Sequence, residues 1–401
     1  MIRKVILITE SPFSQRDHKR FGINILKKNN FEIEIWDITR IIHPDYNLLP
    51  RDSFSGNGLM IFDSKRDVSD NMSKLDRNCT MCINLNNNWL DRLWLFRFYS
   101  KYKIKYAMMA LGIIPQENID KNVRNKSLLR ELSLFKISYS NIKTALRNRL
   151  GLLIPFFYFG VSPAVLLLAS GKLSEDYYYY PRDRNTEVLW LHALDYDLYL
   201  EENNKPFLPD MSGNAVFLDD NVPYHPEEVL FGNDDYPVTA EMYFTNINKF
   251  LDYIEKEQNL KVVIAAHPTS DYSDKPGSFG NRKIIYGNTI GCVRSAKFVI
   301  SHSSTALNYA VLYRKPVIFI YTNEMTKQRG TVFDDNFSSW FGKRPINIDL
   351  PYSIDWKQEL TVDENKYKLY QNAFIKKSNT KEEHIWQTVA NRLSTMQEDK
   401  S

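Results

Sequence analysis

The residues 298–321, FVISHSSTALNYAVLYRKPVIFIY, are the stretch that best predicts the fold of this chain. An apolar run predicts a strand at 298–301, the next residues predict a helix at 304–313, and a second apolar run predicts a strand at 316–321. A strand, a helix and another strand in this order are typical of a parallel sheet with crossover helices. The loop after the first strand, SHSST, has more hydroxyl side chains than a helix cap needs.

The same alternation extends over the rest of the chain. It predicts strands at 5–9, 31–39, 106–111, 164–169, 187–192, 214–218, 261–266 and 283–286, and helices at 19–28, 238–256, 289–295 and 381–396. The 401 residues exceed the usual size of a single core, and the polar stretch 201–209 contains two prolines. We therefore expect an α/β protein with two Rossmann-like domains facing a cleft, at 1–205 and 206–375, and a closing helix and tail at 376–401.

Composition excludes several classes of protein. A hydrophobic fraction of 43% and a charged fraction of 25% argue against wholesale disorder, and a net charge of +4 gives no reason to expect nucleic acid. Three cysteines, Cys79, Cys82 and Cys292, do not make a disulfide framework and favour a reducing compartment. Cys79 and Cys82 have C-x-x-C spacing without a second pair, so we expect two small buried residues next to a strand. The apolar run at 5–8 is too short for a secretory signal, and we expect a cytoplasmic protein.

Two adjoining stretches leave alternatives open. Residues 121–150 have eight Lys or Arg and one acid, Glu131, with apolar residues every three or four positions. This pattern predicts a basic amphipathic helix, either on an anionic membrane surface or packed on a domain with its basic face in water. Residues 151–171 are uncharged, but Pro155, Gly160 and Pro163 interrupt them, which favours a loop and a buried strand over a membrane span. Contact of this stretch with a membrane stays open.

Polar residues follow the predicted strands of the second half, where ligands of parallel sheets bind. The histidine after strand 261–266 is suited to donating to an oxyanion, and the hydroxyls after strand 298–301 are suited to holding one. The residues after strand 283–286 either cap a helix or reach a ligand. The candidate binding residues are His267, Pro268, Tyr286, Asn288, Thr289, Ser303, Ser304 and Thr305.

Carboxylates and further polar residues complete the candidate site. Asp219 directly follows the apolar run 214–218 and is better placed than Asp220 to act as a base, a nucleophile or a hydroxyl ligand; turn formation is the alternative role. Asp195 and Asp197 have the D-x-D spacing that can hold a divalent cation, but this tripeptide is common and we expect no metal. Weaker candidates for an acceptor or the cleft are Ser11, Ser14, Arg16, Asp17, His192, Asp195 and His225, for some of which helix capping is the alternative.

The pair His267-Pro268 and Ser303-Ser304 resembles motifs of GT-B nucleotide-sugar transferases that use CMP-activated acids, such as bacterial sialyltransferases and Kdo transferases. The sequence around these motifs is similar to that of the retaining β-Kdo transferase domains of surface-polysaccharide assembly, glycosyltransferase family 99. The stretches that carry this resemblance are ESPFSQRDHKRFG (10–22), WLHALDYDLYL (190–200), VFLDDNVPYHPE (216–227) and YGNTIGCVRSAKFVISHSSTALNYAVLYRKPVIF (286–319). The resemblance is weak across 115–185.

The resemblance implies transfer of Kdo from CMP-β-Kdo to a glycan or lipid-linked glycan in the synthesis of lipopolysaccharide O-antigen or capsule. Ser303 and Ser304 would bind the CMP phosphate, His267 would contact it and assist its departure, and Asp219 would be the nucleophile, with Asp220 as the competing assignment. No cofactor or metal is implied. An inverting transferase for another CMP-nonulosonate or a UDP-sugar, and a non-catalytic glycan-binding subunit at the inner membrane, are the alternatives.

Overall fold

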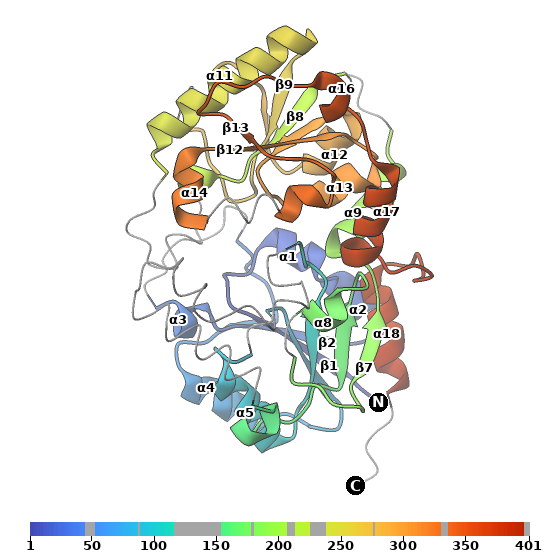
Figure 1. Cartoon of the computed structure of the whole chain (residues 1–401). Helices are drawn as coiled ribbons and strands as arrows, with labels where there is room; N and C mark the ends of the chain where they lie inside the picture. The colour runs from blue at the N-terminus through green and yellow to red at the C-terminus, as the bar shows by residue number, and fades with distance from the viewer. Residues whose placement is uncertain are drawn as a thin grey trace. The chain divides into compact units, whose positions relative to one another are not determined.

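The computed structural model describes residues 1–44, 53–86, 89–115, 154–177, 180–206, 213–224, 238–275, 277–329 and 336–396. The chain forms two compact units (Figure 1). The first contains strands β1 to β7 and the C-terminal segment from Asn379, and the second comprises Gly112–Glu117 and Ala193–Ser378. We placed the boundary at 205 and 206 from sequence. The division instead follows His192, because Asp195 accepts a hydrogen bond from Asn308 Nδ2 (3.0 Å) inside the second unit.

The first unit is built on a parallel sheet of seven strands in the order β3-β2-β1-β4-β5-β6-β7. The strands are β1 Lys4–Thr9, β2 Glu32–Asp37, β3 Leu59–Ile61, β4 Thr80–Asn84, β5 Lys105–Ala110, β6 Leu166–Ala169 and β7 Glu187–Trp190. The helices are α1 Gln15–Arg20, α2 Ile23–Lys28, α3 Thr39–Ile42, α4 Lys65–Met72, α5 Leu93–Tyr102, the 3-10 turn η3 Phe156–Phe159, α8 Ser174–Tyr177 and α18 Ile385–Thr395.

A glycine divides the helix that the sequence predicts at 19–28. Gly22 separates α1 from α2 and has φ +60°, in the left-handed region that favours glycine. An added Cβ there would lie 2.2 Å from Cγ of Trp386, which is fully buried on α18. The Trp386 indole Nε1 also donates to the Arg20 carbonyl oxygen (2.8 Å). The C-terminal helix therefore packs closely on the first unit at this break.

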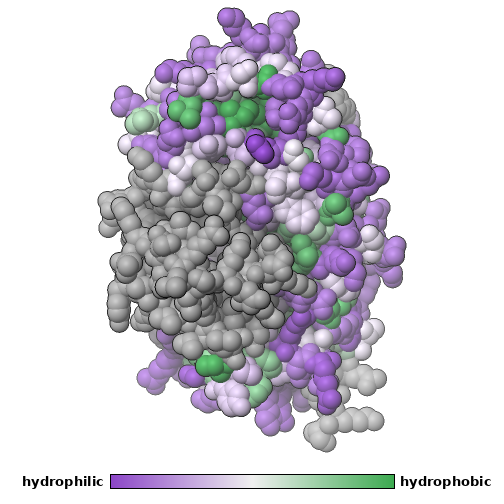
Figure 2. Space-filling view, viewed as in Figure 1, coloured by the Kyte–Doolittle hydropathy of each residue, from purple (hydrophilic) through white to green (hydrophobic). Residues whose placement is uncertain are grey.

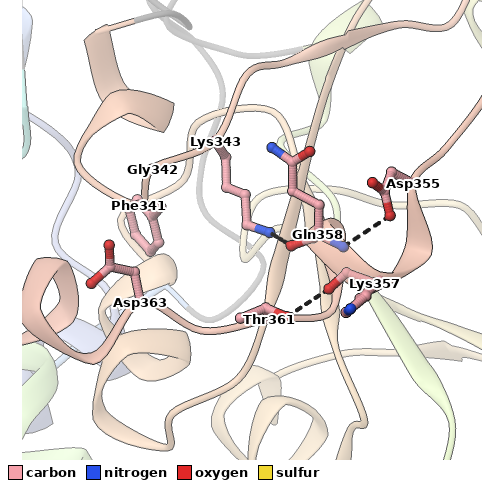
Figure 3. Close-up of a pocket in the computed structure, with 8 residues that line it drawn as sticks. All are labelled: Phe341, Gly342, Lys343, Asp355, Lys357, Gln358, Thr361 and Asp363. Atoms are coloured by element: carbon pink, nitrogen blue, oxygen red, sulfur yellow. Dashed lines mark hydrogen bonds between the residues drawn. The ribbon is translucent and has the colours of Figure 1, made fainter.

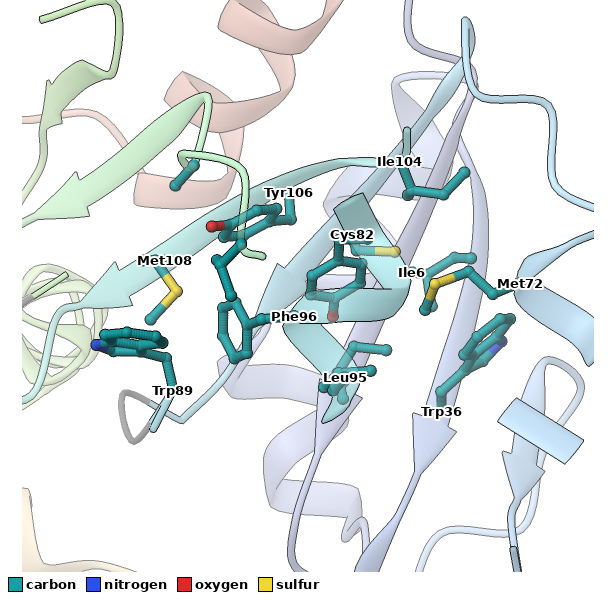
Figure 4. Close-up of a cluster of buried hydrophobic side chains, with 14 of the residues drawn as sticks. Ile6, Trp36, Met72, Cys82, Trp89, Leu95, Phe96, Ile104, Tyr106 and Met108 are labelled. Carbon is teal, nitrogen blue, oxygen red and sulfur yellow. The ribbon is translucent and has the colours of Figure 1, made fainter. Parts of the chain in front are cut away.

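The two cysteines of the C-x-x-C stretch lie in different surroundings. Cys82 lies on β4 and is fully buried beside Ile6, Tyr106 and other apolar side chains (Figure 4). Cys79 precedes the strand and is partly exposed, contrary to our expectation that both are buried. Both thiols are free, and burial raises the pKa of Cys79. Cys82 therefore serves the core.

The uncharged stretch behaves as a loop and a strand where the structure describes it. Pro155 precedes η3, Gly160 ends it in the left-handed conformation, and β6 is fully buried beside β5 and β7. Among the described residues, no helix has the length and hydropathy to cross a bilayer. The predicted basic helix at 121–150 lies outside the described residues.

The second unit is built on a parallel sheet of six strands in the order β10-β9-β8-β11-β12-β13. The strands are β8 Ala215–Leu218, β9 Val262–Ala265, β10 Ile284–Ile285, β11 Val299–Ser301, β12 Val317–Tyr321 and β13 Ile346–Asn347. The helical segments are α9 Leu194–Asn203, η5 Val222–Tyr224, α11 Ala240–Gln258, α12 Thr289–Ser295, α13 Leu307–Leu312, α14 Asn323–Arg329, α16 Trp356–Glu359, α17 Glu364–Tyr370 and the π-helical turn η6 Gln371–Ile375.

The core of the second unit joins its sheet to α11. Phe250 and Ile254 of α11 pack with Phe217 of β8 and Ile264 of β9, and all four side chains are fully buried. A parallel sheet whose central strands β8, β9 and β11 are fully buried, with helices beside it, matches the predicted α/β class, and each unit has one Rossmann-like sheet.

Candidate functional site

The strand order of the second sheet indicates where a ligand binds. β8 pairs with β9 on one side and with β11 on the other, so the order of strands along the chain reverses between β8 and β11. Ligands of open parallel sheets bind beyond the carboxyl ends of the strands at such a reversal. The loops that follow β8, β9 and β11 contain the strongest candidates from the sequence.

Asp219 lies at the end of β8 and is 3% exposed. Its Oδ1 accepts from the Asn221 amide (2.8 Å), and its Oδ2 accepts from the Tyr272 hydroxyl (2.8 Å) and the His267 amide (3.2 Å). Burial raises the pKa of Asp219, and these hydrogen bonds oppose the shift. Oδ2 thus holds the loop after β9 against the end of β8, and Oδ1 fixes the turn that follows β8.

Asp220 makes the corresponding link to the loop after β11. The Ser303 amide donates to Asp220 Oδ2 at 3.4 Å, and both residues are partly exposed. Ser304 Oγ accepts from the Ala306 amide (3.3 Å). The predicted helix at 304–313 is shorter than expected, because α13 begins only at Leu307 and its six residues leave Ser304 and Thr305 in the preceding turns.

The loop after β9 determines which nitrogen of His267 holds the ring proton. His267 Nδ1 accepts from the Thr269 amide (3.3 Å) and lies 2.7 Å from Thr269 Oγ1. An amide can only donate, so the neutral ring has its proton on Nε2. Ser270 Oγ donates to the His267 carbonyl oxygen (2.8 Å), and Pro268 is exposed beside it. Thr269 therefore fixes the orientation of the His267 imidazole, and Nε2 is left as its hydrogen-bond donor.

His302, between Ser301 and Ser303, has a different part. It is 1% exposed; its Nδ1 donates to the Ile320 carbonyl oxygen (2.8 Å), and its Nε2 lies 2.9 Å from the Tyr243 hydroxyl. These contacts tie the end of β11 to β12 and α11. His302 is thus a structural anchor that fixes where Ser303 lies.

Of the three candidates that follow β10, two lie at the start of α12 and the third is exposed. Asn288 caps α12 by accepting from the Gly291 amide (3.2 Å), and Thr289 is the first residue of that helix. Tyr286 is 42% exposed, and its hydroxyl accepts from the Tyr272 amide (3.2 Å). Through Tyr272, this tyrosine is connected to the Asp219 network.

A cavity of about 370 Å³ lies elsewhere in the second unit (Figure 3). Its polar groups serve one another: Lys343 Nζ donates to the Gln358 and Glu359 carbonyl oxygens, and Asp355 accepts from the Gln358 amide. None of the candidates from the sequence is among its lining residues, which are Phe341, Gly342, Lys343, Asp355, Lys357, Gln358, Thr361 and Asp363.

Several acceptor candidates have structural roles. Ser14 and Asp17 form a reciprocal capping box at the start of α1, while Ser11 and Arg16 are exposed. His192 is 1% exposed, and its Nε2 donates to the Glu383 carbonyl oxygen (3.1 Å).

The D-x-D aspartates and the remaining histidine do not extend the site. Asp195 and Asp197 are buried in the first turn of α9, and residues two apart on a helix do not face each other. Within the described ranges, no group of three or more His, Cys, Asp or Glu side chains is arranged to hold a metal. His225 lies outside the described residues.

The structure gathers three side chains that the sequence did not single out. Glu10 Oε2 accepts from Arg92 NH2 (2.7 Å), and both side chains are largely buried. Desolvation, with Arg92 next in importance, lowers the pKa of His43. The three residues follow β1, β4 and β2, and the strand order of the first sheet reverses between β1 and β4. Only Glu10, next to a predicted strand, had a signal in the sequence.

Comparisons with known proteins support the fold. The sequence matches no protein-family model and no curated protein. The wall teichoic acid polymerase TagF is similar in structure, with a TM-score of 0.50 at 11% identity over 98% of this chain and 88% of that chain. A second TagF structure has a TM-score of 0.52 over the same shares of the chains, again at 11% identity. The fold is GT-B.

Other solved structures match less closely. UDP-GlcNAc 2-epimerase from Methanocaldococcus jannaschii has a TM-score of 0.41 at 12% identity, covering 98% of both chains. At these identities the likeness concerns the fold alone.

Proposed function

We propose that this GT-B protein is a glycosyltransferase whose CMP-activated donor binds in the second unit, at the carboxyl ends of β8, β9 and β11. One observation carries the proposal: Asp219 holds the His267 amide and the adjacent Asp220 holds the Ser303 amide. Two consecutive carboxylates thereby bring a histidine and a hydroxyl-rich loop to the point of the sheet where a nucleotide is expected.

The chemistry of these groups suits a departing phosphate. His267 Nε2 would donate to a phosphate oxygen, while Thr269 holds the opposite side of the ring. The hydroxyls of Ser303 and Ser304 would supply further donors, while the Ser303 amide stays bonded to Asp220. A single phosphate is balanced by such donors, so the proposed reaction requires no metal.

The contacts support different roles for the two aspartates. The resemblance assigns the nucleophile to Asp219, but its oxygens already accept three hydrogen bonds in a buried position. Asp220 is more exposed and lies beside the Ser303 amide. In a retaining transfer, Asp220 would attack the anomeric carbon as CMP leaves, and the acceptor hydroxyl would then displace the carboxylate. Asp219 would act as a positioning residue.

The identity of the sugar rests on the resemblance to family 99, which favours Kdo and an acceptor in lipopolysaccharide O-antigen or capsule. An inverting transferase for another CMP-nonulosonate or a UDP-sugar would use the same phosphate site, with Asp220 as a base or a structural residue. A non-catalytic subunit would bind glycan without turning over a donor.

Acceptor recognition is proposed for the first unit. Glu10 and Arg92 offer hydroxyl groups an acceptor and a donor side by side, and each sugar hydroxyl can both donate and accept. A neutral His43 beside them would add a further polar contact. Glu10→Gln and Arg92→Lys should raise the KM for the acceptor and leave CMP affinity unchanged.

A nucleotide-binding screen tests the donor site first. Calorimetry with CMP, CDP, UMP and UDP should show CMP bound most tightly by the wild type. Changing Ser303 and Ser304 together to Ala should weaken CMP binding by about 1–3 kcal/mol, the usual value of hydrogen bonds to a charged group. Ser273→Ala, an exposed serine of the same unit that bonds Asp271, is the matched control. Equal CMP affinity in all three proteins would contradict this placement.

Turnover separates the remaining functions. CMP release from CMP-Kdo, measured with and without a glycan acceptor, should occur if the protein is a Kdo transferase. Binding without turnover of any CMP-sugar would favour the non-catalytic subunit. A product with inverted anomeric configuration would contradict the retaining mechanism while leaving the donor site in place.

A further inference from the structure

An exposed pair of aromatic rings projects from the first unit. Phe157 and Tyr158 of η3 are 58% and 74% exposed, and their ring centroids are 4.5 Å apart. Their neighbour Phe156 is buried in the core and forms an edge-to-face contact with Phe157. The turn is therefore anchored on one side and presents two large rings to solvent on the other.

Helix α5 holds this turn in place. Arg97 Nε donates to the Phe159 carbonyl oxygen (2.8 Å), and Ser100 Oγ accepts from the Ser162 amide (2.7 Å). Both contacts come from the surface of α5 that adjoins η3. The exposed rings of Phe157 and Tyr158 therefore lie on the flank of α5 that contains Arg97 and Ser100.

The helix adds a row of aromatic side chains. Trp94, Phe98 and Tyr102 are spaced four residues apart and lie along one face of α5, half-buried. Ring centroids are 5.6 Å apart for Trp94 and Phe98 and 6.4 Å for Phe98 and Tyr102. The row packs on the core and beside α4, where the Tyr102 hydroxyl lies 2.8 Å from Ser69 Oγ, and its half-buried rings are partly exposed to solvent.

Positive side chains accompany these rings. Arg97, Lys101 and Lys103 are exposed, and no Asp or Glu occurs between Arg92 and Pro115. Lys101 Nζ lies 4.8 Å from the Tyr102 ring centroid. On neighbouring α4, Lys65 Nζ lies 5.5 Å from the Trp94 ring centroid, and the Asp70 carboxylate is paired with Arg66 (3.8 Å). Cations therefore border the rings on α5, whereas α4 has Lys65 and Arg66 together with the exposed acids Asp67 and Asp70.

We propose that this surface binds an anionic lipid bilayer. We name it the α5 surface; it consists of Phe157 and Tyr158 on one flank of α5, Trp94, Phe98 and Tyr102 on the other, and the exposed Arg97, Lys101 and Lys103. Aromatic rings favour the boundary between lipid headgroups and acyl chains, and exposed Lys and Arg favour anionic headgroups. Figure 2 shows apolar side chains exposed at the lower edge of the first unit, where Figure 1 places α5.

The α5 surface also adjoins the proposed acceptor residues. Arg92, which pairs with Glu10, immediately precedes Leu93–Tyr102. One helix therefore begins at the candidate acceptor cluster and continues along the lipid-binding surface. This arrangement suits an acceptor attached to lipid. Bilayer binding itself is independent of the donor proposal.

Vesicle sedimentation tests the α5 surface. The full-length protein should sediment with vesicles of phosphatidylglycerol and phosphatidylcholine, and much less with phosphatidylcholine alone. Changing Phe157 and Tyr158 together to Ser should weaken binding at least about tenfold, because two rings no longer enter the interface. Changing Lys101 and Lys103 together to Glu should have a similar effect that shrinks at high salt.

Leu369→Ser is the matched control, since Leu369 is 61% exposed on α17 in the second unit. It should leave vesicle binding unchanged, and all variants should keep wild-type unfolding midpoints. A wild type that stays in the supernatant, or variants that bind as well as the wild type, would overturn the proposal. The proposal would also be overturned if the wild type is a dimer that binds no vesicles and the Phe157 and Tyr158 changes convert it to a monomer. A second copy of the chain would then be the partner of this surface. None of these outcomes affects the CMP-binding test.

Discussion

Replacing Asp219 by Asn distinguishes a positioning residue from a nucleophile. The carboxylate accepts from the Asn221 amide, the His267 amide and the Tyr272 hydroxyl. An Asn side chain offers one carbonyl oxygen, so one of the two backbone amides loses its acceptor whichever way the side chain turns. The Tyr272 hydroxyl can rotate and accept from the new NH2 group.

The magnitude follows from that single orphaned amide. A buried donor without a partner costs about 1–3 kcal/mol. Burial raises the pKa of Asp219, so removing its charge also removes a desolvation cost and offsets part of this loss. We expect Asp219→Asn to lower the free energy of unfolding by about 1–2 kcal/mol, and to weaken CMP binding because the His267 loop is less firmly held.

Urea unfolding and CMP calorimetry on wild type, Asp219→Asn and Asp220→Asn measure these effects. Asp220 accepts one long hydrogen bond at 3.4 Å and is partly exposed, so its replacement should change stability by less than about 0.5 kcal/mol. It should abolish transfer while leaving CMP bound at least as tightly, since a negative charge beside the phosphate is removed. If Asp219→Asn is as stable as the wild type, binds CMP normally and is inactive, the positioning role of Asp219 is refuted and Asp219 is the nucleophile.

Four other outcomes are expected. Gly22→Ala should lower the unfolding free energy by about 2–4 kcal/mol, because a Cβ would collide with Trp386; Gly112→Ala, where a Cβ meets nothing within 4 Å, is the control in the same urea titration, and equal losses would contradict the packing. Because the pKa of His43 is lowered in the folded state, the unfolded chain takes up a proton first as the pH falls, and stability is lost from about pH 7 downward; His43→Gln should reduce that slope in unfolding experiments, and an unchanged slope argues against it. Mass spectrometry of protein quenched with CMP-Kdo should locate the added sugar on Asp220, whereas an adduct on Asp219 would identify Asp219 as the nucleophile. Finally, the predicted basic helix at 121–150 lies outside the described residues, and changing Arg130, Lys143 and Arg147 to Glu should weaken sedimentation with anionic vesicles if its basic face binds lipid.

The sequence by itself determined the class of fold and the positions of the candidate donor-site residues at strand ends. Buried parallel strands appear in the sequence as short apolar runs. The residues that directly follow such a run must lie at the carboxyl end of its strand, because they are joined to it in the chain. The predicted helix 289–295 has the observed bounds of α12, and the strand predicted at 298–301 lies within one residue of β11. His267, Ser303 and the two aspartates could therefore be placed at strand ends without a structure.

Only the tertiary structure decided which polar side chains already form hydrogen bonds within the protein. Ser14, Asn288 and Asp195 look like binding residues in the sequence, but a cap or a hydrogen bond within its unit uses each of them. Asp219 and Asp220 are neighbours in the chain, yet one is buried among donors and the other is partly exposed.

The Glu10 and Arg92 pair joins residues that are distant in sequence, and no local pattern predicts it. Strand order brings such groups together, and strand order depends on how separate apolar runs pair in the sheet. Local periodicity therefore predicts the elements, whereas the partners of each polar group depend on long-range packing.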